Sequence, residues 1–253
     1  MKNNIEMSCI SHRGYVRENN EDNLYFSGHI LDLEHGSMTE PLVSCISTAG
    51  TEPVAVFDGM GGENAGEVAS FTAAEKFSNI CRIPIIEKSY VLHMMEELNK
   101  AVCAKAERGK LGQIGCTATI LFFHLQYAYL INVGDSPAFI FRNGKLKQIS
   151  QKHTDETFLR QANVRMRKPV LTQFLGIPRE EMLLEPYLVG IEIQQGDIFL
   201  VCSDGLTDMV PEMKICNILS RNTDVCQMTK DLLEKALVAG GEDNTTIICC
   251  KVK

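Results

Sequence analysis

Six acidic side chains stand out in the sequence because together they could bind divalent metal ions. They are Glu21, Asp22, Asp58, Asp135, Asp204 and Asp243. Carboxylate oxygens select hard cations, so a cluster of these acids would take magnesium or manganese rather than zinc. Two such ions lower the pKa of a bound water and neutralise developing negative charge, which is the chemistry that hydrolysis of a phosphate ester requires.

The acids lie where predicted β-strands begin or end. Apolar runs and turn spacing predict strands over 54–57, 117–125, 127–133, 138–142, 197–202 and 245–252. Asp58, Asp135 and Asp204 follow such segments. Glu21 and Asp22 precede a further strand segment, Asn23–Phe26, and Asp243 precedes the last strand. In an antiparallel sheet the end of one strand lies beside the start of its neighbour, so all six acids can converge at one edge.

A simpler interpretation is that these acids only shape turns. Aspartate next to glycine favours turns, and Asp58-Gly59 and Asp204-Gly205 each fit that pattern. Six acids at strand ends are harder to explain in this way. The loop from Asp58 to Gly62 also carries three glycines, which let the backbone approach a ligand and offer a carbonyl oxygen. No G-x-x-x-x-G-K-[ST] motif occurs, so a nucleoside triphosphate site is not indicated.

Three segments show apolar residues at the three-to-four spacing of a helix. They begin at Gly66, near Ser89 and near Val225. The order is strands, a helix pair, more strands, a second helix pair and a final strand, which predicts an α+β fold. We expect a central antiparallel β-sandwich with pairs of antiparallel helices on both outer faces, in four layers (α-β-β-α). Residues 27–52 and 153–170 lack clear periodicity and are expected to form loops, whereas Asn143-Gly144 predicts a hairpin turn.

Composition predicts one globular domain over residues 1–253. Of the 253 residues, 45% are hydrophobic and 23% are charged, and no linker or repeat divides them. The net charge of −7 argues against a nucleic-acid partner. No segment resembles a membrane helix or a signal peptide, so we expect a cytoplasmic protein without membrane contact. Ten cysteines without a C-x-x-C pair predict reduced thiols packed as small apolar residues.

Six segments match, in order, the motifs of one known family. They are Arg17-x-x-x-Glu21-Asp22, Asp58-Gly59-Met60-Gly61-Gly62, Gly115-Cys116-Thr117-Ala118, Gly134-Asp135-Ser136, Ser203-Asp204-Gly205 and Glu242-Asp243-Asn244. On these motifs the chain resembles the metal-dependent serine/threonine protein phosphatases of type 2C, bacterial branch, from about residue 5 to residue 252. The resemblance implies hydrolysis of phosphoserine and phosphothreonine in proteins, including a cognate kinase and its substrates, by a monomeric enzyme.

The resemblance also implies a site with two manganese or magnesium ions. Asp58 would bridge both ions, and the Gly59 carbonyl would bind one of them. Glu21 would complete one metal site, and Asp204 and Asp243 would complete the other.

Three further roles follow from the same resemblance. Asp22 would orient the metal-bound water, and Asp135 together with Asp204 would hold a third, weaker ion. Arg17 would hold the phosphate oxygens, for which its planar fork of donors is well suited. An arbitrary arginine is usually a solvated surface residue, but the position four residues before Glu21-Asp22 favours the phosphate role.

The sequence departs from the family pattern at several positions. Pro137 replaces the arginine that commonly follows Gly-Asp-Ser, and Met60 stands where animal members have a histidine proposed as general acid. Lys152 replaces the aspartate before His153-Thr154. The segment 155–170 is short where relatives carry a longer flap, so substrate selection is not carried over. Two interpretations of the basic residues in this segment stay open: they bind acidic phosphopeptides, or they are a solvated run of charges. These residues are Arg160, Arg165, Arg167 and Lys168.

Other functional classes are weaker. No cysteine has an arginine six positions later, which excludes a cysteine-dependent phosphatase, and no G-x-S-x-G motif indicates a serine hydrolase. A non-catalytic, regulatory phosphatase-like module would be expected to lack the metal-binding acids, which are present here. A metal-dependent phosphatase of small phosphomonoesters stays open, because catalysis on phosphate needs the same metal site.

Overall fold

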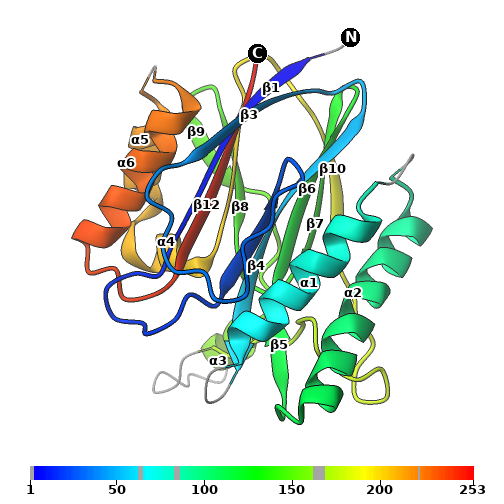
Figure 1. The fold of residues 1–253 in the computed structure, drawn as a ribbon. Helices are drawn as coiled ribbons and strands as arrows, with labels where there is room; N and C mark the ends of the chain where they lie inside the picture. Colours follow the sequence, from blue (N-terminus) through cyan, green and yellow to red (C-terminus); the bar gives the residue numbers. More distant parts are fainter. Residues whose placement is uncertain (1–2, 62–64, 83–85, 162–168, 222) are drawn as a thin grey trace.

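The computed structural model describes residues 3–61, 65–82, 86–161, 169–221 and 223–253. Within these ranges the chain forms two antiparallel β-sheets and six helices (Figure 1). The predicted α+β fold class is therefore confirmed. None of the described helices is long and apolar enough to cross a membrane.

The first sheet has the strand order β3, β1, β12, β11, β8 and β9. These strands are β3 (Leu42–Ser47), β1 (Asn4–His12), β12 (Thr245–Val252), β11 (Ile198–Cys202), β8 (Ala138–Arg142) and β9 (Lys145–Gln148). The second sheet has the order β10, β7, β6, β4 and β2, with β5 paired to the end of β4. These strands are β10 (Tyr187–Glu192), β7 (Tyr127–Val133), β6 (Ala118–His124), β4 (Thr51–Gly61), β2 (Asp22–Phe26) and β5 (Ile114–Cys116).

Helices pack on each sheet through separate apolar clusters. α1 (Gly66–Ile80) and α2 (Lys88–Gly109) cover the second sheet in a cluster that includes Phe77 and Leu98. α4 (Asp204–Met209), α5 (Glu212–Leu219) and α6 (Val225–Val238) join the first sheet in another. A third cluster lies between the sheets, where Phe123 of β6 meets Phe199 of β11 edge to face with ring centroids 5.5 Å apart.

The ten cysteines are all free, and six of them are buried. Each apolar cluster contains two of the six: Cys81 and Cys116 under α1 and α2, Cys9 and Cys250 between the sheets, and Cys202 and Cys249 under α4, α5 and α6. The prediction that cysteines serve as small apolar residues is confirmed for these six.

Central strands read as continuous apolar runs because both of their faces are covered. Every residue of β11 is buried, and in β12 only Lys251 is not. Five predicted strands are confirmed to within one residue at each end as β6, β7, β8, β11 and β12, and 54–57 is the middle of β4. The turn at Asn143 and Gly144 is also confirmed, with positive φ angles of 52° and 74° as a two-residue hairpin turn requires.

The expectation that 27–52 and 153–170 form only loops is wrong. The first segment contains β3 and the start of β4. β3 is an edge strand whose Leu42 and Val43 are both exposed, so no apolar alternation marks it. In the described part of the second segment, Glu156–Gln161 forms α3, which is too short to show a helical period. Strands β1, β5, β9 and β10 were also not among the predicted strands.

Candidate functional site

Asp22 and Asp58 lie directly opposite each other where β2 pairs with β4. Opposite residues of an antiparallel pair have Cβ atoms about 4.5–5.5 Å apart, on the same face of the sheet. Asp22 is only 1% exposed. Burial, with smaller effects from the charges of Asp243 and Glu21, raises the pKa of Asp22 to about 7. Two carboxylates held this close with little water favour a positively charged partner.

The other predicted acids surround this pair. Loss of solvation, followed by the charges of Asp22, Asp204, Asp135 and Asp243, raises the pKa of Asp58 well above its ordinary value. Burial and then neighbouring carboxylates raise the pKa of Asp204 to about 7. Burial is also the main cause of the raised pKa of Glu21 and of Asp135. The structure therefore brings all six acids into one electrostatic neighbourhood.

Asn244 fastens the loop before β2, which ends at Glu21. Its Oδ1 accepts a hydrogen bond of 2.7 Å from the Glu21 backbone N–H. Its Nδ2 donates to the carbonyl oxygens of Arg13 and Asn19 at 2.8 and 2.9 Å. Since Asn244 directly follows Asp243, these bonds draw Glu21 to the end of the first sheet where Asp243 lies.

Thr117 holds the backbone of Asp58. The Asp58 N–H donates to Thr117 Oγ1 at 3.1 Å, and the Thr117 N–H donates to the Asp58 carbonyl at 2.8 Å. The same hydroxyl lies 2.7 Å from the Oγ of Ser136, which follows Asp135. Thr117 and Ser136 are both buried. A hydrogen-bonded chain thus links Asp58 to the turn that carries Asp135.

Ser203 holds the side chain of Asp22. Its Oγ donates to Asp22 Oδ2 at 2.7 Å and accepts the Thr246 backbone N–H at 2.9 Å. A donor to the carboxylate favours its charged form and partly opposes the effect of burial on the pKa of Asp22. Ser203 follows β11 of the first sheet and Asp22 begins β2 of the second, so this bond ties the two sheets together at the acids.

Four supporting side chains were not predicted as site residues. They are Thr117, Ser136, Ser203 and Asn244. A signal for them existed, because each stands inside a matched motif and the last three directly adjoin a predicted metal ligand. Their partners were not readable from the sequence, since the bond from Ser203 to Asp22 spans 181 positions.

Gly59 occupies a position where no side chain fits. A Cβ on this residue would overlap the carbonyl oxygens of Glu21 and Gly66. Its N–H donates to the Glu21 carbonyl at 3.1 Å. The glycine therefore allows the Asp58 loop to lie directly against the backbone of Glu21.

Arg17, predicted to bind phosphate, is bound to an acid in this structure. Its Nη2 donates to Asp243 Oδ2 at 2.7 Å. Partial burial by itself lowers the pKa of the guanidinium. The hydrogen bond and charge of Asp243, with the charges of Glu21 and Asp204, outweigh that effect and raise the pKa of Arg17. Arg17 thus lies beside Asp243 and supplies the acids with one positive charge.

Asp135 lies near Lys152, which replaces an aspartate of the family pattern. The His153 N–H donates to the Gly134 carbonyl at 3.0 Å, and the Gly134 N–H donates to His153 Nδ1 at 3.2 Å. These two hydrogen bonds between the segments bring Lys152, the residue before His153, near Asp135. Burial raises the pKa of Asp135, whereas its own backbone N–H and the charge of Lys152 oppose the rise. The carbonyl of Pro137, the other departure here, accepts the Cys202 N–H at 3.1 Å.

The short flap is only partly described. Arg160 of α3 forms an ion pair with Glu156 one turn earlier. The other basic residues considered for phosphopeptides, Arg165, Arg167 and Lys168, lie outside the described residues.

The acids fit divalent cations in chemistry and in charge. All donors are oxygen atoms, which magnesium and manganese prefer. Burial first, and neighbouring carboxylates second, raise the pKa of Asp22, Asp58 and Asp204, so their charged forms are disfavoured unless a cation compensates them. In the part of the chain that the structure describes, no three Asp, Glu, His or Cys side chains are spaced as a ready-made metal site. The fit therefore rests on donor type and charge, not on ligand distances.

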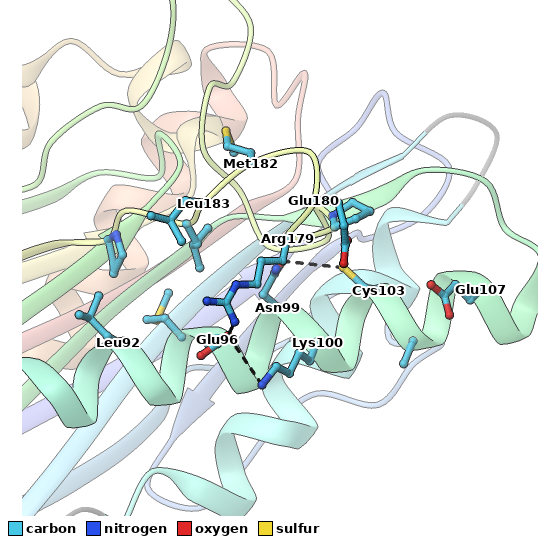
Figure 2. A pocket seen from close by; sticks show the side chains of 15 residues that line it. Leu92, Glu96, Asn99, Lys100, Cys103, Glu107, Arg179, Glu180, Met182 and Leu183 are labelled. Atoms are coloured by element: carbon cyan, nitrogen blue, oxygen red, sulfur yellow. Dashed lines mark hydrogen bonds and ion pairs between the residues drawn. The ribbon is translucent and has the colours of Figure 1, made fainter.

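Two cavities of the described structure bear on the candidate site. A cavity of about 480 Å³ is lined in part by Arg13, Asn20, His35 and Glu67; Asn20 and Glu67 lie near Asp22 and Glu21, although none of the six acids lines the cavity itself. A cavity of about 560 Å³ lies between α2 and residues 178–186 (Figure 2). None of the six acids lines this second cavity, so it is separate from the candidate metal site.

Known proteins resemble this chain along most of its length. The family model for Protein phosphatase 2C matches residues 30–157. The serine/threonine phosphatase stp of Listeria welshimeri is 30% identical over 93% of this chain and 91% of that protein. The chain belongs to the protein phosphatase 2C family. Membership confirms the resemblance stated from the motifs and the prediction of a hydrolytic enzyme of the protein phosphatase class.

Solved structures of the protein phosphatase 2C family share the fold. The catalytic domain of the serine/threonine protein phosphatase PstP, solved in complex with two manganese ions, is 28% identical with a TM-score of 0.79, and the match covers 100% of this chain and 99% of that one. The serine/threonine phosphatase of S. agalactiae is 25% identical with a TM-score of 0.81, over 98% of this chain and 100% of that one. The two-sheet α+β fold described above is therefore the fold of this family.

Proposed function

We propose that the protein removes phosphate from phosphoserine and phosphothreonine in other proteins, with water activated at a binuclear manganese or magnesium site. The observation that carries the proposal is the cross-strand pair of Asp22 and Asp58, both of whose pKa values are raised, chiefly by loss of solvation. Acids placed in this way are stabilised by cations. The two manganese ions of the related PstP catalytic domain support the same cofactors here.

The proposal assigns the metal ligands as the motifs indicate. Asp58 would hold both ions, and the Gly59 carbonyl would bind one of them. Glu21 completes one site, and Asp204 and Asp243 complete the other. When bound, the ions lower the pKa of a water and neutralise charge that develops on the phosphate. The bonds from Asn244 to the Glu21 backbone and from Thr117 to the Asp58 backbone fix these ligands in position.

Residues that bind no tight ion have separate roles. Asp22, which accepts a hydrogen bond from Ser203, would orient the attacking water. Arg17 binds the phosphate oxygens after it releases Asp243. Asp135, with Asp204, holds a third and weaker ion. Met60 has no proton to give, so the leaving group takes its proton from water.

The proposal extends to the organisation of the chain. We infer a four-layer α-β-β-α arrangement within a single catalytic domain of residues 1–253. It is supported by the three apolar clusters, one between the sheets and one under each helix group. We also infer a monomeric cytoplasmic enzyme that acts on phosphorylated proteins, among them a cognate kinase. A non-catalytic role is disfavoured because every predicted acid is present and placed near the others.

Phosphate release from synthetic phosphopeptides tests the proposal. Phosphothreonine and phosphoserine peptides should lose phosphate with manganese, less or equally well with magnesium, and not at all with EDTA. A phosphotyrosine peptide of the same sequence is the matched control, and it should react slowly. Release that continues undiminished in EDTA would overturn the metal mechanism. Hydrolysis of p-nitrophenyl phosphate without hydrolysis of any peptide would instead favour a phosphatase of small phosphomonoesters.

A further inference from the structure

Asn99 of α2 makes three hydrogen bonds to a loop outside its own helix. Its Oδ1 accepts the backbone N–H of Gly176 at 2.7 Å and that of Ile177 at 3.2 Å. Its Nδ2 donates to the Ile177 carbonyl at 2.8 Å. The residue is only 7% exposed. Figure 2 shows Asn99 pointing from α2 toward the segment that carries Arg179.

The loop that Asn99 holds is bound tightly to β5. Leu175, the residue before Gly176, exchanges two backbone hydrogen bonds of 2.9 and 3.0 Å with Cys116. Gly176 has a φ of +110°, and a Cβ on it would overlap the Ile114 carbonyl oxygen. Only glycine therefore permits this close approach of the loop to the strand.

β5 leads directly to Thr117, the residue that holds the backbone of Asp58. Cys116 lies opposite Gly59 in the pairing of β4 with β5. The next residue, Thr117, exchanges hydrogen bonds with the backbone of Asp58. We propose that Asn99 is a positioning residue for Asp58, acting through the loop at Leu175 and through β5. The inference rests on the proposed function, in which Asp58 bridges the metal ions.

Variants of Asn99 can separate an effect on the position of β5 from an effect on the stability of the whole protein. In Asn99→Ala, two N–H groups and one carbonyl would lose their partner in a buried place, so the loop would shift or open toward solvent. Asn99→Asp keeps the acceptor for Gly176 and Ile177 but loses the donor to the Ile177 carbonyl. Because aspartate also sets a second oxygen against the Ile177 carbonyl, both variants are expected to disturb the loop if these bonds position β5.

The test compares these variants with Leu233→Ala in the full-length protein. Leu233 is buried in the cluster under α4, α5 and α6 and has no bond to the path from Asn99 to Asp58. Manganese affinity is measured by calorimetry below the unfolding temperature of every variant, and amide hydrogen exchange is measured at Cys116 and Leu175. A second control, Lys100→Ala, removes the surface residue next to Asn99; among the described residues, the Lys100 ammonium pairs with Glu96 and Glu97.

Asn99→Ala should weaken manganese binding about 3- to 10-fold, less than the about 10- to 100-fold typical of a residue that contacts a metal ligand directly. It should also accelerate exchange at Cys116 and Leu175, whereas both controls should leave manganese affinity and these two amides unchanged. If Asn99→Ala keeps wild-type manganese affinity and loses only thermal stability, this inference is overturned but the proposed function is not. Absence of manganese binding by the unsubstituted protein would overturn the proposed function and this inference with it.

Discussion

The guanidinium of Arg17 donates a hydrogen bond of 2.7 Å to Asp243, so the residue predicted to bind phosphate is held by a residue predicted to bind metal. The two side chains are 50% and 33% exposed, which leaves both accessible to other partners. A cation at Asp243 competes with Arg17 for the same carboxylate, and phosphate competes with Asp243 for the same guanidinium. Metal binding should therefore free Arg17 to receive the substrate.

Arg17→Ala should lower kcat/KM about 10- to 150-fold, because a charge-assisted hydrogen bond contributes about 1.5–3 kcal/mol. Most of the loss should appear in KM, since the phosphate is anionic in both the bound substrate and the transition state. Arg17→Lys should recover only part of it, because it keeps the charge but not the fork. Steady-state kinetics with inorganic phosphate as inhibitor checks this. An unchanged KM and unchanged phosphate inhibition would leave Arg17 as a surface residue paired with Asp243.

Asp58→Asn should abolish hydrolysis of p-nitrophenyl phosphate and yet stabilise the metal-free protein. The substitution removes one negative charge from a place where the pKa of Asp58 is raised by lost solvation and by four neighbouring carboxylates. Thermal unfolding in EDTA near neutral pH should show a higher Tm than that of the wild type. Glu234→Gln, an exposed position on α6, is the matched control and should change neither property. A lower Tm for Asp58→Asn would mean that the acids do not repel one another.

The metal-free protein should lose stability as pH rises from about 4 to about 7. Asp22 and Asp204 have an ordinary pKa of 3.8 and a pKa of about 7 in the folded protein. Between these values the folded protein binds protons that the unfolded chain has released. The stabilising contribution is therefore complete below the unfolded pKa and is lost as pH rises through the folded pKa. Urea unfolding in EDTA across this range measures the decline.

Manganese should remove much of that decline, because the cation takes the place of the protons. Its binding should accordingly release more protons near pH 6 than near pH 8, which calorimetry in buffers of different ionisation enthalpy detects. Metal-free stability that increases over the same range would contradict the raised pKa values of Asp22 and Asp204.

Asp135→Ala should leave the two tight metal sites intact and reduce turnover. The residue lies on a separate turn, held by Ser136 and by the bonds of Gly134 to His153, and the charge of Lys152 lies nearby. These features suit a weaker site. Calorimetric titration with manganese, beside a measurement of kcat, distinguishes the outcomes. Loss of a tight site in Asp135→Ala would make Asp135 a ligand of the binuclear centre.

The placing of the acids was predictable because it depends on strand order and direction. Asp58 follows an apolar run and Asp22 begins another, and antiparallel pairing then sets the two opposite each other. Burial on both faces makes such runs visible in the sequence. Edge strand β3, with exposed Leu42 and Val43, and the short helix α3 carry no such signal, which is why they were expected to be loops.

The supports of the acids were not predictable for a different reason. A hydroxyl or amide side chain gives no periodic pattern, and its partner is set by the tertiary fold. Asn99 and Ile177 are 78 positions apart, and Ser203 and Asp22 are 181 apart. The sequence can therefore suggest which residues bind metal, but not which side chains hold those residues in place.

The six buried cysteines give the molecule its own set of unfolding reporters. Burial raises the pKa of Cys9 and Cys249 to about 12, so these thiols react with alkylating reagents only after water reaches them. Because each apolar cluster holds one pair, the order in which the pairs become alkylated during slow denaturation gives the order in which the interface between the sheets and the two helix–sheet interfaces separate. Mass spectrometry could read that sequence of events from the natural chain, without any introduced label.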